Sequence, residues 1–552
     1  MKKNSIFLVF CLFSFALVLP SCEDILDVDS ARYVTVDDNE PLSSKDSINN
    51  ILGLLRGLQN VAERYVLLGE VRADLLDVTV FTTADIRQLS DFTVEATSVY
   101  ANPRDYYAII NNCNYFINRT SEAGSLPTEN VLAHAIRAWT YMQVAFNWGK
   151  VYYFTEPLLS VQDTQKEYPE YTIPQLIETL IEDLEPLAEA VYPNYGTIYN
   201  FGSESLFFPM KVLLGDLYLW RGVSTEDYEK AATYYAEYID QKIITGNGNQ
   251  RYTISWSYEN FVSQNFERAK PDDMWSRCTV ASSSPELITA VQMAANASEG
   301  KVNRLRENYS YFQSSDLIND LWDDQSYLLH YVSSTATTDY YTTGDLRKQG
   351  NILGNVTITD ATLTNADPVS ISVLTKLYAA EHILINRLGT VFLRYAEAVN
   401  RAGKPHTAFA VLKYGLGPET FMDDAKIPRT ELADNMPYIT IFNTQKYTGA
   451  IGIHARGCGD SAFDINYTIG TDNEILDVQS DTIRRVEDLI CNELALETSF
   501  EGNRFQDLMR ISLRRNDPSF LAKPVATKHK EDYNRIYSLL SDTKNWFLPE
   551  PK

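Results

Sequence analysis

Cysteine and histidine are scarce in this sequence, and their scarcity excludes several classes of protein. The 552 residues include six cysteines and six histidines. Two of the cysteines belong to the N-terminal segment, and the other four are scattered too widely for a disulfide framework. There is no CxxC or HExxH motif, and the spacing of the histidines predicts no metal cluster. We therefore expect neither a metal site nor a cofactor.

Positive charge is also in deficit. Lysine and arginine total 48 against 73 aspartate and glutamate residues, which gives a net charge of −25. An acidic surface repels nucleic acids and other polyanions. We therefore expect no nucleic-acid partner, whereas neutral ligands remain compatible with the composition.

The apolar run near the N-terminus is too short to span a membrane. Residues 6–20 read IFLVFCLFSFALVLP and follow Lys2 and Lys3. A spanning helix needs about 20 apolar residues. A charged start, a short apolar stretch and a small residue at its end are typical of a secretory signal peptide. We expect residues 1–21 to be this signal peptide.

A cysteine marks the end of that segment. Leu19 and Ser21 lie three and one places before Cys22, a pattern that resembles a bacterial lipobox. We expect Cys22 to be lipidated and to become the first residue of the mature chain. The acidic stretch that follows, residues 22–40, is expected to be a solvated tether. The alternative is an ordinary secreted protein in which Cys22 merely falls near the cleavage site.

Helical periodicity with small residues at contact positions runs through much of the chain. Residues 103–120 place apolar side chains on one face at three- and four-residue spacing. Residues 210–242 match the L-G-x-x-Y core of a tetratricopeptide first helix with Leu214, Gly215 and Tyr218. Gly222 is expected to end that helix. A second helix pair is expected over 391–416.

The chain alternates between helical and irregular segments. Short strands and loops rich in Ser, Thr, Asn and Gly are expected over 243–380 and 417–480. Long irregular segments are usually functional, and we expect them to carry the ligand face. The helical scaffold is expected over 41–242, 381–416 and 481–515. The fold class is therefore mostly α, with tetratricopeptide-like helix pairs in a single domain over 41–552.

The C-terminal stretch ELALETSFEGNRFQDL carries a regular pattern of charge. Glu493, Glu497 and Glu501 lie four residues apart on one helical face, where like charges repel unless cations neutralise them. We interpret them as a structural charge network, in which Arg504 neutralises Glu501 and Asp507. A glycosidase acid pair at the first two glutamates is the alternative, and their helical spacing disfavours it.

The same stretch, with the spacing E-L-A-x-E-x-x-x-E-G-x-R-x-x-D-L, closely resembles the C-terminal motif of the SusD/RagB family. Other segments are similar to family elements in the same order: FNWGKVYYFTEPL (146–158), GDLRK (344–348) and the closing NWFLPEPK. The resemblance covers nearly the whole chain. It implies a SusD-like fold, an α-α superhelix.

The resemblance also implies a function. Members of the family are lipid-anchored at the outer face of the outer membrane, and they capture glycans, or sometimes peptides, for a SusC-like TonB-dependent transporter. They are not enzymes. We therefore expect a non-catalytic, cell-surface glycan-binding lipoprotein. The alternatives are capture of peptides or another nutrient by the same architecture, and a secreted hydrolase.

Ligand-contacting residues are sought among aromatic side chains in irregular segments. Tyrosine is abundant, with 35 residues, and aromatic rings offer an apolar face for stacking. The candidates are Trp275, Trp322, Tyr340, Tyr341, Phe81 and Tyr100. The alternative for each is an aromatic side chain that anchors its own loop.

Overall fold

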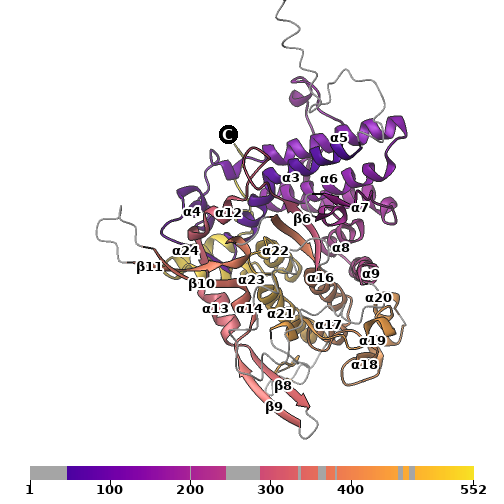
Figure 1. Ribbon diagram of the computed structural model, residues 1–552, viewed down its shortest axis with the longest axis vertical. Coiled ribbons are helices and arrows are strands. Elements are labelled where there is room, and N and C mark those ends of the chain that lie inside the picture. The colour runs from indigo at the N-terminus through magenta and orange to yellow at the C-terminus, as the bar shows by residue number, and fades with distance from the viewer. Residues whose placement is uncertain are drawn as a thin grey trace, which may run out of the picture.

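The computed structural model describes the greater part of the chain (Figure 1). The described residues are 47–198, 201–243, 286–332, 337–358, 368–378, 382–434, 436–457, 464–470 and 479–551. The expected signal peptide, Cys22, the acidic tether and Trp275 all lie outside them. These predictions are therefore not tested by the structure.

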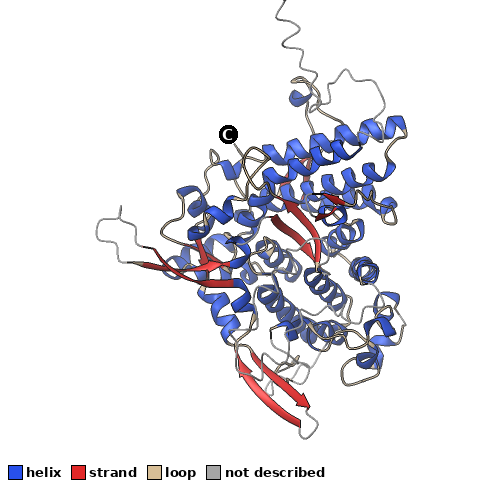
Figure 2. Ribbon diagram, viewed as in Figure 1, coloured by secondary structure: helices blue, strands red, loops and turns tan. Residues whose placement is uncertain are grey.

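The architecture is mostly helical, which confirms the expected fold class (Figure 2). The main helices are α3 (Ser47–Glu70), α5 (Arg104–Ala123), α6 (Pro127–Trp148), α7 (Ile173–Leu184), α8 (Met210–Arg221), α9 (Thr225–Lys242), α13 (Asp316–Asp323), α16 (Leu388–Arg401), α17 (Pro405–Lys413), α21 (Gln479–Thr498), α22 (Arg504–Arg515), α23 (Ser519–Lys528) and α24 (Tyr533–Leu540). Short helices connect them: α4 (Ala84–Ser90), α12 (Arg304–Glu307), α14 (Arg347–Asn351), α15 (Thr375–Tyr378), α18 (Pro418–Phe421), α19 (Arg429–Leu432) and α20 (Pro437–Thr440).

Strands are short and form separate antiparallel pairs, six of them in the described part of the chain. The pairs are β1 (Leu76–Val78) with β7 (Phe312–Ser314), β2 (Lys150–Tyr152) with β3 (Glu170–Thr172), β4 (Thr197–Ile198) with β5 (Phe201–Gly202), β6 (Leu287–Gln292) with β12 (His382–Arg387), β8 (Ser326–Val332) with β9 (Thr337–Thr343), and β10 (Ile352–Ile358) with β11 (Val369–Leu374). Figure 2 shows β8–β9 and β10–β11 projecting from the helical body.

The α8–α9 pair shows why the sequence forms a tetratricopeptide-like unit. Gly215 is required because a Cβ there would lie 2.5 Å from the ring of Tyr235 on α9. Gly222 ends α8 in the left-handed conformation, with φ of 40°, as expected. The side chain of Ser224 then caps α9 by accepting a hydrogen bond from the Asp227 N–H. Close helix packing and defined ends together fix the pair.

The helices pack as successive antiparallel layers around one apolar core. α5 packs on α6, and α7 on both α6 and α8; α16 packs on α9, α17 and α21. The apolar face expected over 103–120 is buried, since Tyr106, Ile109, Ile110, Cys113 and Phe116 are each at most 4% exposed. The C-terminal helices α21 and α22 thus lie at the centre of the scaffold (Figure 1).

The regularly spaced glutamates of α21 enter a buried charge network. Glu497 accepts hydrogen bonds from Arg387 and Arg456 on one oxygen and from Arg347 on the other, at 2.5 to 3.0 Å. Burial alone would raise the pKa of Glu497, but these three guanidinium groups hold it well below its usual value. The carboxylate is therefore ionised and stabilises the arginines around it.

The neighbouring glutamates are neutralised in the same way. Glu493 accepts from Arg347 at 3.2 Å and lies 3.0 Å from the His454 Nδ1. Glu501 accepts from Lys376 and Arg387. All of these side chains are buried, so the geometry is that of a structural network.

The prediction that Arg504 neutralises Glu501 and Asp507 was wrong. Arg504 forms a two-pronged ion pair with Asp74, at 2.7 and 2.8 Å, while Glu501 is neutralised as described above. Asp507 lies beside Arg510, whose Nη1 is 2.8 Å from Oδ1. Asp74 lies just after α3, more than 400 residues before Arg504. Sequence spacing within one helix carries no information about so distant a partner, which explains the error.

Candidate functional site

Three segments far apart in sequence bring aromatic side chains to one surface. The loop after β1 contributes Phe81, the turn after α12 contributes Tyr309 and Tyr311, and the end of α15 contributes Tyr378. α4 and α12 lie close together in Figure 1, next to β10 and β11. We call these four residues, together with Tyr100, the aromatic surface.

Hydrogen bonds hold the first two segments together. The Thr79 hydroxyl donates to the Ser310 carbonyl and the Thr82 hydroxyl to the Tyr311 carbonyl, both at 2.6 Å. The Thr79 N–H also donates to the Tyr311 carbonyl at 3.0 Å. Phe81, half-buried between the two threonines, is thereby fixed beside the tyrosine turn.

The third segment joins through an aromatic contact. The rings of Tyr309 and Tyr378 pack edge to face, with centroids 5.3 Å apart and planes at 78°. This is a favoured geometry for an aromatic pair. Tyr378 remains 38% exposed, so the pair presents ring surface to solvent.

Tyr100 lies near Asp85 of α4, the helix that follows Phe81. It sits in the short 3-10 helix Val99–Ala101, whose Val99 carbonyl accepts a hydrogen bond from Arg64 at 2.8 Å. Burial and, to a smaller extent, the nearby Asp85 together raise the pKa of Tyr100 to about 12. The phenol therefore stays protonated at neutral pH and is a hydrogen-bond donor.

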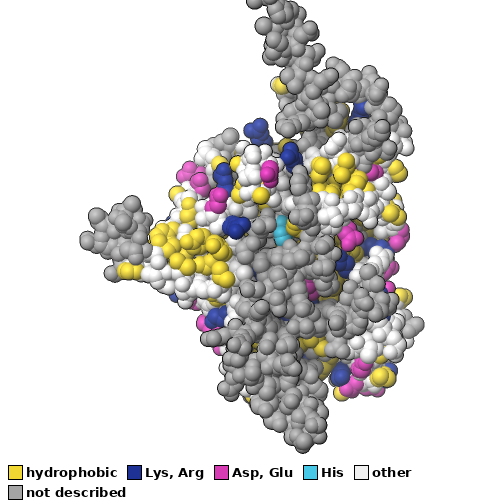
Figure 3. All heavy atoms as spheres, in the orientation of Figure 1, with side chains coloured by type: hydrophobic (Ala, Val, Ile, Leu, Met, Phe, Trp, Pro, Cys, Tyr) yellow, Lys and Arg dark blue, Asp and Glu magenta, His cyan; other side chains and the backbone are white. Residues whose placement is uncertain are grey.

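Hydrophobic side chains gather on the same side of the molecule. Figure 3 shows a patch of them around β10 and β11. On β10, Leu353 is 55% exposed and Val356 39%. Contiguous exposed apolar patches often mark binding sites on protein surfaces.

The structure corrects the prediction for Trp322. This residue is fully buried on α13 and packs edge-on against Phe500, with ring centroids 6.2 Å apart. Its neighbour Asp323 is exposed and pairs with Lys348. The acidic neighbours in the sequence point to solvent while the indole points to the core, so Trp322 offers no face to a ligand.

The other candidates are placed apart from one another. Tyr341 is 60% exposed on β9, and Tyr340 is the preceding residue of the same strand. Figure 1 places the β8–β9 hairpin at the far end of the molecule from α4 and α12. The structure thus brings Phe81 and Tyr100 to the aromatic surface but leaves Tyr341 away from it.

Sequence reasoning missed three tyrosines of this surface: Tyr309, Tyr311 and Tyr378. The segment ENYSYF alternates tyrosine with small polar residues just after a short helix. That alternation, in an irregular segment, is the signal that could have found the first two.

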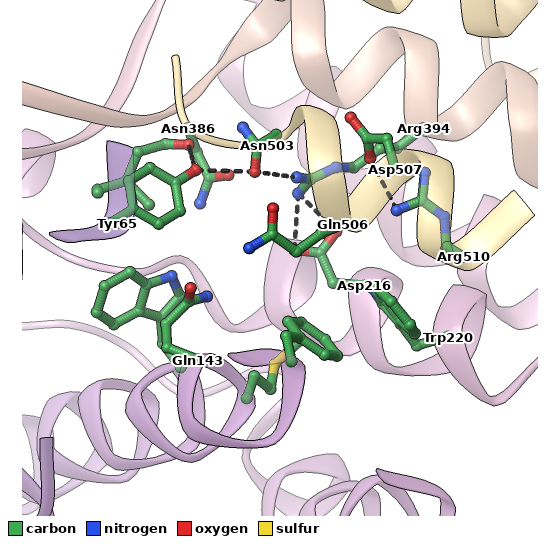
Figure 4. Close-up of a pocket in the computed structure, with 14 residues that line it drawn as sticks. Tyr65, Gln143, Asp216, Trp220, Asn386, Arg394, Asn503, Gln506, Asp507 and Arg510 are labelled. Atoms are coloured by element: carbon green, nitrogen blue, oxygen red, sulfur yellow. Dashed lines mark hydrogen bonds and ion pairs between the residues drawn. The ribbon is translucent and has the colours of Figure 1, made fainter. Parts of the chain in front are cut away.

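A second feature is a small polar cavity inside the scaffold (Figure 4). Its volume is about 40 Å³, which is room for a few water molecules, whereas pockets for small organic ligands have about 300–1,000 Å³. The cavity is therefore not a glycan site. In the described part of the chain, no group of three or more His, Cys, Asp and Glu side chains could hold a metal ion.

No protein-family model matches the chain. The SusD-like protein P38 of Formosa agariphila is 25% identical over 211 residues, which are 37% of this chain and 41% of that protein. The chain thus matches about two fifths of the length of this curated relative.

Solved structures match over nearly the full length. A SusD superfamily protein from Bacteroides vulgatus has a TM-score of 0.57 at 15% identity, with coverage of 92% of this chain and 96% of that one. One from Bacteroides thetaiotaomicron has a TM-score of 0.55 at 16% identity, with coverage of 92% and 98%.

These similarities define the class of protein as one with the SusD superfamily fold. The local sequence match to a SusD-like protein agrees with this fold. The predicted resemblance is confirmed. No helix in the described ranges is long and apolar enough to cross a membrane.

Proposed function

We propose that this protein is a cell-surface lipoprotein that captures a glycan and delivers it to a SusC-like TonB-dependent transporter in the outer membrane. The observation that carries the proposal is the aromatic surface, which three loops present on one side of a SusD-like scaffold. In this proposal the protein binds and releases its ligand without chemistry.

The chemistry of the surface suits a sugar. Sugar rings have C–H faces that stack on aromatic side chains, and hydroxyl groups donate to or accept from polar side chains. Tyr378 supplies exposed ring area, and Tyr100 supplies a protonated phenol. The strongly acidic chain favours a neutral ligand over a polyanion.

The test is binding of purified polysaccharides by the mature chain, before and after removal of the tyrosine pair. Each stacking contact contributes about 1 kcal/mol, or roughly fivefold in Kd, so Tyr309→Ala/Tyr378→Ala should weaken binding by about 25-fold. Tyr341→Ala removes a tyrosine ring that is even more exposed, on the distant hairpin, and is the matched control. Equal affinity of the double variant and the parent would place the ligand elsewhere.

The salt dependence separates the ligand classes. A neutral glycan has no charge to be screened, so the parent should bind it with the same Kd at low and high salt. A steep loss of affinity with salt would point to a cationic peptide. Hydrolysis products from a bound oligosaccharide would instead support the alternative that the protein is a secreted hydrolase.

The lipid anchor has its own test. Cys22→Ala should move the protein from the detergent-requiring membrane fraction to the soluble fraction without changing its Tm, because we propose that Cys22 begins a solvated tether outside the folded domain. Retention of the variant in membranes would contradict the anchor. Cleavage of the wild-type protein by protease added to intact cells is expected if it is displayed on the surface.

A further inference from the structure

The small cavity in Figure 4 lies where the helical scaffold meets the C-terminal helices. Its walls come from α3, α6, α8, β12, α16 and α22. Gln506 reaches in from α22 and Gln143 from α6 on the other side (Figure 4). The cavity is thus shared by elements from across the whole sequence.

Several polar atoms on its walls have no hydrogen-bond partner among the described protein groups. They are Oε1 of Gln143, both amide atoms of Gln506, both carboxylate oxygens of Asp507 and Nε of Arg394. Each of these side chains is at most 7% exposed. Arg510 Nη1 lies 2.8 Å from Oδ1 of Asp507, but their relative orientation does not make a hydrogen bond. Buried polar atoms in native proteins are almost always paired with protein or with ordered water.

The charges on the walls balance. Arg394 is neutralised by Asp216 at 2.8 and 2.9 Å, and Arg510 by Glu397 at 2.6 and 2.9 Å. The two arginines and two aspartates that line the cavity therefore favour a neutral occupant over an ion. The unpaired atoms include both donors and acceptors, which a neutral molecule with both properties satisfies.

We infer that the cavity is a binding site for a small cluster of water molecules, which complete the hydrogen bonds of Gln143, Gln506 and Asp507. A buried water typically makes about three hydrogen bonds and needs about 10–15 Å³. The cavity of about 40 Å³ provides the space, and the unpaired wall atoms provide the hydrogen-bond partners. The cluster solvates the Asp507 carboxylate, which receives no hydrogen bond from the protein groups that the structure describes.

A high-resolution crystal structure of the mature protein tests this directly. We expect ordered water within hydrogen-bond distance of the Gln506 amide and the Asp507 carboxylate. Density for a metal ion or an anion would overturn the inference. An empty cavity that takes up xenon would also overturn it, because xenon enters dry apolar cavities.

A substitution gives an independent test. Gln506→Leu keeps the approximate volume and removes both amide atoms, so the waters lose their partners and Tm should fall by about 2 °C. Gln349→Leu, at an exposed glutamine, is the matched control and should leave Tm unchanged. A Tm for Gln506→Leu equal to or above that of the parent would show that the site prefers an apolar side chain and is dry.

Discussion

The buried charge network and the aromatic surface are built in opposite ways. The network concentrates ionised side chains around α21, where Glu497 alone contacts three arginines and all four side chains are at most 2% exposed. The aromatic surface uses neutral rings held by a few hydrogen bonds at the outside of the fold. Under the proposed function, stability and ligand contact therefore depend on different residues, and we expect that each can be disturbed without the other.

The largest expected effect is from removal of the centre of the network. Glu497→Ala leaves Arg347, Arg387 and Arg456 buried with less negative charge, and breaking a buried ion pair costs about 3–5 kcal/mol. We expect the free energy of unfolding, measured in urea at pH 7, to fall by about 5 kcal/mol.

The control is an exposed ion pair. Asp316→Ala breaks the contact with Lys530, in which both side chains are more than two thirds exposed. Surface pairs contribute little, so the urea transition should not move. Equal transitions for Glu497→Ala and the parent would contradict a structural role for the network.

Trp322→Ala should behave as a core substitution. The indole is fully buried against Phe500, and truncation of a buried tryptophan costs about 3–5 kcal/mol. We expect the free energy of unfolding to fall by about 4 kcal/mol, with the Kd for ligand unchanged in the folded fraction. Loss of ligand affinity without loss of stability would show that Trp322 contacts the ligand.

The pH dependence of stability tests a single buried carboxyl group. Glu70 is fully buried at the end of α3 and accepts from the Phe500 and Gly502 N–H groups. Burial raises its pKa from 4.5 to about 7. Between these values the folded state binds more protons than the unfolded state, so this group makes stability fall as pH rises, by at most about 3 kcal/mol.

Comparison with Glu70→Gln isolates that effect. Burial lowers the pKa of His529 to about 4, which makes stability rise with pH below about 6.5, so the absolute slope of the parent mixes the two groups. The free energy of unfolding of the parent, measured in urea relative to that of Glu70→Gln, should fall between pH 5 and pH 7.5. A difference that is constant across this range would contradict the raised pKa.

The smallest effect separates the ring of Tyr378 from its hydroxyl. If stacking dominates, Tyr378→Phe should change the Kd of the glycan by less than twofold, whereas Tyr378→Ala should raise it about fivefold. Titration calorimetry with one oligosaccharide measures both. Equal losses in the two variants would show that the phenol, and not the ring face, makes the contact.

Local sequence patterns predicted local structure. The periodicity of 103–120 and the L-G-x-x-Y core became α5 and α8, because both patterns depend on contacts between near neighbours or one adjacent helix. The even spacing of three glutamates in α21 likewise indicated a network. Its cations could not be predicted, since they come from other elements, such as Arg347 on α14 and Arg387 on β12.

The candidate site was harder to predict for the same physical reason. The aromatic surface exists only where three distant loops meet, and a single sequence carries no information about which loops do so. Trp322 is different, because a usable signal was present. Ile318 and Trp322 are four residues apart on α13 and both fully buried, and this helical spacing indicates a core face more strongly than acidic neighbours indicate exposure.

The short β1–β7 pair also has a consequence for the order in which the aromatic surface assembles. It sets Leu76 opposite Ser314, and the hydrogen bond beside it joins Thr79 and Ser310 across 231 residues. Closing so long a loop costs entropy before any contact repays it. The tyrosine turn therefore reaches Phe81 only after the chain has been made at least as far as Ser314 and has folded back onto β1. A shorter nascent chain lacks the proposed ligand surface.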